Sequence, residues 1–151
     1  PLDRLVAADR DAGVFDQLRL RGISEEVAMT ARLIAHWLSF GPLILIATLP
    51  ASALLSLSGP TFWRLLASLL AGTPGLAAIG LMTAALLASL RGGTALAGLM
   101  LAPLAVPLVI FGAGHLARVD MSGALFAGAF SLVLCAIAPF AAAAAIRAAR
   151  D

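Results

Sequence analysis

Three aspartates near the start of the chain, Asp9, Asp11 and Asp16, are the first residues whose spacing suggests chemistry. Carboxylates this close together could hold a divalent cation and a phosphate, as in membrane alcohol-phosphotransferases. Those enzymes need a longer ordered run of acids with glycine and arginine in a fixed pattern, and this stretch lacks it. Charge runs are more often solvated surface than metal sites. We therefore predict neither a metal site nor catalytic residues here.

Two histidines and one cysteine are the other candidate ligands. A histidine can ligate haem iron, but His36 and His115 fall near opposite sides of the bilayer that the sequence predicts and cannot share one iron. A single histidine in such a position is more often a polar side chain at the membrane interface whose hydrogen bonds are made. Cys135 lies mid-span, where cysteine packs as a small residue. The sequence predicts no bound cofactor.

No set of residues suggests an enzyme or a nucleic-acid-binding protein. The chain has no lysine, which excludes a GxxxxGK[ST] phosphate loop, so any ATP must be hydrolysed by another chain. A nucleophile, a base and an orienting group do not occur together. All ten basic residues are arginines, the formal charge is only +2, and basic and aromatic residues are not interleaved.

Most of the chain, including both histidines and the cysteine, is predicted to form membrane helices. Hydrophobic residues make up 62% of the chain and charged residues 12%, which leaves too little polar surface to cover a water-soluble core. Four windows lack Asp, Glu, Lys and Arg, and each exceeds the roughly 20 residues needed to cross a bilayer. Backbone groups in lipid must bond within the segment, so each window predicts a helix. We expect an all-α polytopic membrane bundle with spans at about 33–57, 65–89, 93–115 and 122–146.

The arginines predict the orientation. Short separators, "GPTFWR", "LRGG" and "HLARVD", favour antiparallel neighbours. With the N-terminal segment and the C-terminus in the cytoplasm, the positive-inside rule is satisfied, because most arginines then lie inside. The outside pair is Arg64 and Arg118; the inside set is Arg4, Arg10, Arg19, Arg21, Arg32, Arg91, Arg147 and Arg150.

Prolines and glycines break the regularity of the spans. A proline removes a backbone hydrogen bond and clashes with the preceding turn. Simple packing kinks and hinges of a moving transporter explain this pattern equally well. The hinge candidates are Gly72, Pro74, Pro103 and Pro107.

The segment before the first span is polar and has a weakly amphipathic pattern. Apolar residues recur at helical spacing over residues 2–18, Gly13 is expected to split this helix, and Gly22 to end it. Ser24, followed by two glutamates, predicts a new helix start. We expect residues 1–31 to form a cytoplasmic coupling segment and residues 32–151 to form the membrane domain.

Five motifs, in order, resemble one family. They are "DRDAGVFDQLRLRG", "LIAHWLSFGPLIL", "LLAGTPGLAAIG", "SLRGGTALAGLMLAPLAVPLVIFGAG" and "APFAAAAAIR". Together they resemble CcmB (haem exporter protein B), the permease subunit of the cytochrome c maturation ABC transporter. That family has six spans, so the chain would correspond to its last two-thirds. The first residue is Pro, and we expect the sequence to be part of a longer protein.

The resemblance implies a role and partners. The opening segment would be a coupling helix that docks on an ATPase subunit, with the candidate contacts Asp11, Gly13, Phe15, Gln17 and Leu18. The implied partners are a CcmA-like ATPase, a CcmC-like haem-handling membrane subunit, a CcmE-like periplasmic haem chaperone and the lipid bilayer, with haem as substrate. The implied location is the bacterial inner membrane.

Two alternatives stay open at this point. The chain could be another ABC-2-type export permease that moves a lipid or a polysaccharide. It could also be a membrane scaffold that transports nothing. Association with a haem chaperone would distinguish the first alternative, and the upstream coding sequence the second.

Overall fold

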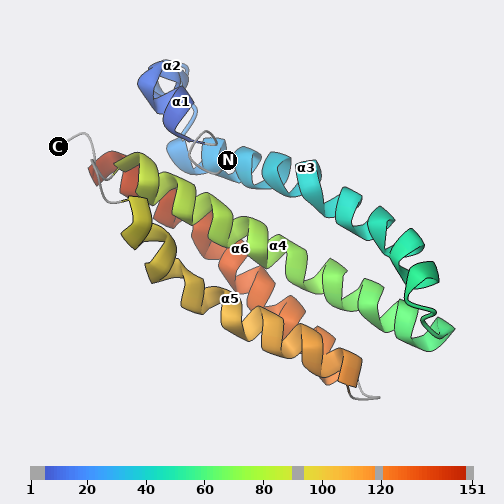
Figure 1. Ribbon diagram of the computed structural model, residues 1–151. Helices are drawn as coiled ribbons and strands as arrows, with labels where there is room; N and C mark the ends of the chain where they lie inside the picture. Colours follow the sequence, from blue (N-terminus) through green and yellow to red (C-terminus); the bar gives the residue numbers. More distant parts are fainter. Residues whose placement is uncertain (1–5, 90–93, 118–120, 149–151) are drawn as a thin grey trace.

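A computed structural model describes residues 6–89, 94–117 and 121–148, and this part of the chain is built from six helices (Figure 1). Two are short and four are long. They are α1 (Ala7–Asp11), α2 (Val14–Leu20), α3 (Glu25–Leu54), α4 (Gly59–Ser89), α5 (Thr94–Ala117) and α6 (Ser122–Ala148).

The N-terminal segment forms two helices because glycines set its turns. Gly13 has a φ of 69° and Gly22 a φ of 77°, a left-handed conformation that glycine adopts without strain. The split at Gly13 and the end before Gly22 confirm the sequence prediction. The Ser24 hydroxyl then accepts a hydrogen bond from the Val27 N–H at 3.4 Å, which caps α3.

Helix α3 runs without a break from its water-exposed start into the apolar span. The domain boundary expected between residues 31 and 32 therefore falls inside one continuous helix. Pro42 and Pro50 also lie within α3 and do not end it. The water-exposed start and the apolar span are consequently parts of one helix.

The beginning of α4 differs from the prediction. The segment "GPTFWR" was expected as a separator, but it forms the first turns of α4, which begins at Gly59. Proline is well tolerated in a first turn because its missing N–H has no helical partner there. Ser58 starts this helix, since its carbonyl accepts from the Phe62 N–H at 3.0 Å.

The expected fold class is confirmed. Helices α3, α4 and α6 are long and apolar enough to cross a membrane. Helix α5 runs beside α4 and α6, and residues Ala102–Ala117 form its shorter apolar part. The four long helices make an all-α polytopic bundle.

Helix α4 is the centre of the bundle. It contacts α3, α5 and α6, and its closest partner is α6. Alanines on both helices are fully buried, so the two backbones approach closely, as is usual for membrane helices. The completely buried alanines of the two helices are Ala77, Ala78, Ala84, Ala85, Ala127, Ala138, Ala142 and Ala143.

The charged groups collect at one end of the bundle. Helices α1 and α2, the start of α3 and the end of α6 lie together there, and the α3–α4 turn lies at the other end (Figure 1). The described arginines divide accordingly, with Arg64 near the second end and Arg10, Arg19, Arg21, Arg32 and Arg147 at the first. Arg4, Arg91, Arg118, Arg150 and the "LRGG" separator lie outside the described residues.

Candidate coupling site

Arg32 fastens the N-terminal segment to the first span. Its Nη2 lies 2.5 Å from Asp9 Oδ2 of α1. Its guanidinium carbon lies 4.8 Å from the centroid of the Phe15 ring of α2. A guanidinium over an aromatic face gains a cation–π attraction in addition to the ion pair. One side chain of α3 thus holds both short helices.

Apolar packing supports this fastening. Phe15 is 2% exposed, and Val6 and Met29 are fully buried. Leu18 packs against the same cluster from the next turn of α2. Phe15 and Leu18 are three residues apart, so they share one face of the short helix. This face of α2 points into the protein.

The opposite face of α2 is open to solvent. Gln17, Arg19 and Arg21 are exposed, and Leu20 is 89% exposed. A leucine this exposed, between two arginines and outside the apolar spans, has no packing role in the described part of the chain. An exposed apolar side chain of this kind is available for contact with a partner, and buried apolar anchors dominate interface energies.

The five coupling candidates differ in exposure. Asp11 and Gln17 are exposed, and Gly13 forms the turn between α1 and α2. Phe15 and Leu18 face inward and hold α2 on α3. Sequence reasoning missed Arg32 and Leu20. A leucine flanked by arginines in the charged segment was the available signal for Leu20.

A second ionic contact joins α6 to the start of α3. Arg147 Nη1 lies 2.5 Å from Glu26 Oε1 and 3.6 Å from Glu25 Oε2. Both glutamates are in the first turn of α3, where negative charge is favoured by the helix dipole. The charged end of the bundle is therefore tied together from α1 to α6.

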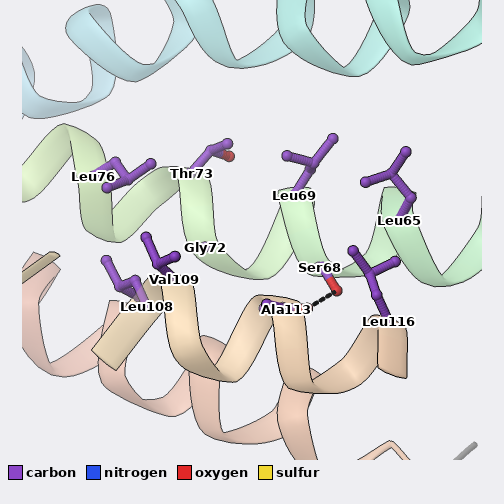
Figure 2. Close-up of a pocket in the computed structure, with 11 residues that line it drawn as sticks. Leu65, Ser68, Leu69, Gly72, Thr73, Leu76, Leu108, Val109, Ala113 and Leu116 are labelled. Carbon is purple, nitrogen blue, oxygen red and sulfur yellow. Dashed lines mark hydrogen bonds between the residues drawn. The ribbon is translucent and has the colours of Figure 1, made fainter. Parts of the chain in front are cut away.

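Gly72, a hinge candidate, lies beside free space. A cavity of about 270 Å³ lies between α4 and α5 beside Gly72. Figure 2 shows Leu108 and Val109 of α5 on the α4 side of their helix, and the Ser68 hydroxyl donates to the Gly112 carbonyl at 3.2 Å. A Cβ added at Gly72 would meet nothing within 4 Å. Helix α4 is therefore loosely packed at Gly72.

Gly75, only three residues further, is enclosed. A Cβ added there would lie 2.7 Å from Ser131 Oγ of α6 and 2.9 Å from Leu108 Cδ1 of α5. The other three hinge candidates lie within unbroken helices, Pro74 in α4 and Pro103 and Pro107 in α5. Loose and tight packing thus alternate within one turn of α4.

The two histidines lie apart, on α3 and at the end of α5. His36 is half-buried, with its ring 5.2 Å from that of Phe40. His115 is 1% exposed and packs where α6 begins, close to Gly123. The Cys135 thiol donates to the Pro74 carbonyl at 3.4 Å, so this cysteine contributes to the α4–α6 interface.

Comparison with known proteins identifies the family. The family model described as "CcmB protein" matches residues 1–149. The chain belongs to the CcmB family. "Heme exporter protein B" of Paracoccus denitrificans is 40% identical over 97% of this chain and 69% of its own length. The protein of the same name from Rhodobacter capsulatus is also 40% identical, with the same coverage. That of Haemophilus influenzae is 36% identical over 99% of this chain and 70% of its own length.

Membership of the CcmB family agrees with the helical architecture. The match includes α1 and α2 as well as the apolar helices, so the N-terminal segment is part of the family pattern. This CcmB family member is a multi-pass membrane protein, with helices long and apolar enough to span the bilayer.

Proposed function

We propose that this chain is the permease subunit of a haem-exporting ABC transporter that acts in cytochrome c maturation. The family match over residues 1–149, with relatives named "Heme exporter protein B", is the observation that supports this most strongly. ATP hydrolysis belongs to a separate CcmA-like subunit. A CcmC-like membrane subunit and a CcmE-like periplasmic chaperone handle the haem.

The orientation that we propose places α1, α2 and the C-terminus in the cytoplasm of a bacterium, at the inner membrane. The gathering of Arg10, Arg19, Arg21, Arg32 and Arg147 at one end of the bundle supports it, because cytoplasmic ends of spans are enriched in arginine. The exposed Trp63 and the half-buried Phe62, whose ring centroids are 5.3 Å apart, then lie at the outer interface, where aromatic rings are favoured.

The mechanism begins at the exposed face of α2. The ATPase subunit binds Leu20 and the polar residues around it, which include Asp11 and Gln17. Phe15, Leu18 and Arg32 hold α2 on α3, so a pull on α2 moves α3. We propose that residues 1–31 form the coupling segment, residues 32–151 the permease domain, and Gly72, Pro74, Pro103 and Pro107 the points where the spans bend.

A reconstituted complex tests this function. The chain, its ATPase and membrane partners are placed in lipid nanodiscs, and ATP-dependent transfer of haem to the periplasmic chaperone is measured. We expect transfer only when ATP is hydrolysed. ATP-driven movement of lipid or polysaccharide without haem transfer would instead identify another export permease. Complete inactivity of a correctly assembled complex would favour a scaffold.

A pair of matched variants tests whether the ATPase subunit docks on the exposed face of α2. Leu20→Ala should weaken co-purification of the ATPase subunit about tenfold, as expected for the loss of an apolar anchor. Leu54→Ala is the control, because Leu54 is 86% exposed, against 89% for Leu20, and lies at the other end of α3. Equal ATPase recovery with both variants would place the docking face elsewhere.

A further inference from the structure

Trp37 connects α3 to α4 within the bundle. Its indole Nε1 donates a hydrogen bond to Thr73 Oγ1 at 3.0 Å. Thr73 is 2% exposed and Trp37 is half-buried, so the bond is largely shielded from solvent, which strengthens a hydrogen bond and makes the loss of one partner costly. The bond joins the span that carries the coupling segment to the central helix.

Gly41 sets the position of the indole ring. A Cβ added at Gly41 would lie 2.8 Å from Trp37 Nε1, closer than any real contact. Any other residue at position 41 would therefore displace the ring from Thr73. Glycine at position 41 thus leaves the space that the indole ring occupies when it bonds to Thr73.

Thr73 belongs to the part of α4 where the other spans meet it. The next residue, Pro74, accepts the Cys135 hydrogen bond from α6. Gly75 packs against Ser131 of α6 and Leu108 of α5. A displacement of Thr73 therefore also displaces residues that contact α5 and α6.

The distance from the coupling site to this bond is short. Trp37 follows Arg32 by five residues of uninterrupted helix, which correspond to about 7.5 Å along the axis. A helical segment of this length behaves as a rigid piece. Movement of α2 that displaces Arg32 thus displaces Trp37 with it.

We propose that the Trp37–Thr73 hydrogen bond is the joint that passes movement of α3 to residues 73–75 of α4, and through them to α5 and α6. Trp37 is then a positioning residue for transport, since it acts through Thr73 and touches no substrate in this account. The inference rests on the proposed function and specifies how its mechanical step crosses from one span to the next.

Three variants test the joint in the complete nanodisc complex, with haem and the periplasmic chaperone as probes. Trp37→Phe removes the donor and keeps an aromatic ring over Gly41, and Thr73→Val removes the acceptor without changing volume. The measured quantity is haem transferred per ATP hydrolysed. We expect each variant to lower this ratio about fivefold, the size of one net hydrogen bond, with ATP hydrolysis itself unchanged. The double variant should be no worse than either single variant, because both remove the same interaction.

Two further variants separate coupling from packing. Thr73→Ser keeps the hydroxyl and should restore the ratio. Ser68→Ala removes a different hydrogen bond of α4, to α5 at 3.2 Å, and should leave the ratio at the wild-type value. A wild-type ratio in Trp37→Phe, additive losses in the double variant, or an equal loss in Ser68→Ala would each overturn the inference.

The same experiment distinguishes this inference from the proposed function. ATP-dependent transfer by the wild-type complex with unaffected variants would overturn the joint alone. Absence of haem transfer by the assembled wild-type complex would overturn the proposed function, and the joint with it.

Discussion

Helices α3 and α4 have nearly the same length and opposite surroundings. They contain 30 and 31 residues, yet 50% of the most apolar window of α4 is buried in the protein, against 17% for α3. The buried helix is rich in glycine and alanine where it meets α6. The other helix directs large aliphatic side chains outward, among them Leu43, Ile46 and Leu49.

The two helices differ in how tightly their neighbours hold them. Close contacts around Gly75 fix α4 against α5 and α6, because small side chains leave no slack between backbones. Helix α3 has few such contacts, and its outward side chains meet lipid equally well in different positions. Helices α1 and α2 are attached to the loosely packed α3, as the proposed coupling role requires, and four predictions test this contrast.

The largest effect is expected for Gly75→Leu. A side chain at this position collides with Ser131 and Leu108, and the contact with the Ser131 backbone, 3.1 Å from the added Cβ, cannot move aside. We expect a loss of roughly 4 kcal/mol or more, the range of severe overpacking, and hence little folded protein. The fraction that remains monodisperse after heating in mild detergent measures it. Normal yield and stability would show that the helices around α4 are not tightly fixed.

A smaller loss is expected for Leu81→Ala in the buried half of α4. Leu81 is fully buried, and its truncation should cost roughly 3 kcal/mol through lost packing contacts. The matched change on α3 is Leu43→Ala, at a leucine that is 65% exposed and that lipid can replace. We expect that change to stay within about 0.5 kcal/mol. Equal losses in detergent unfolding curves would contradict the contrast between the two helices.

Arg32→Met should release the N-terminal segment without unfolding the spans. The change removes the ion pair to Asp9 and the cation–π contact with Phe15, together about 1–2 kcal/mol for a partly buried site. Amide exchange in residues 7–20 should accelerate about 5- to 30-fold, the factor that this energy corresponds to. Exchange within α4 serves as the internal control. Unchanged exchange in α2 would mean that apolar packing alone holds the segment.

The smallest change in stability is expected for Gly72→Ala. The added methyl group meets no atom within 4 Å, and alanine favours a helix by up to about 1 kcal/mol over glycine. The variant should therefore be slightly more stable. If Gly72 is a bending point, haem transferred per ATP should nevertheless fall. A more stable variant with full transport would remove Gly72 from the proposed hinges.

Much of the fold could be predicted from the sequence. The charge-free windows predict four spans, since an unpaired backbone is excluded from lipid. Gly13, Gly22 and Ser24 predict the turns of the N-terminal segment, because glycine and serine have local conformational reasons to lie there. The start of α4 was misplaced, because Arg64 bounded the charge-free window from which the span was predicted, whereas the helix begins at Gly59 and includes this arginine.

The candidate site was only partly predictable. The amphipathic spacing identified α2, but the direction of Phe15 depends on Arg32, 17 residues later in the chain and on another helix. Trp37 and Thr73 gave no local signal, because their pairing joins two helices across 36 positions of sequence. Interactions between distant segments arise from packing, which no local pattern records.

Hydropathy and charge along the chain are enough to predict a bundle of membrane helices with a charged segment at one end, and the motifs point to the family. Only the packing of the helices shows that α4 is the centre, that Gly72 is loosely packed while Gly75 is enclosed, and that Leu20 rather than Phe15 faces outward. Lipid is as apolar as a protein core, so hydropathy places a helix in the membrane but does not say which of its faces meets protein.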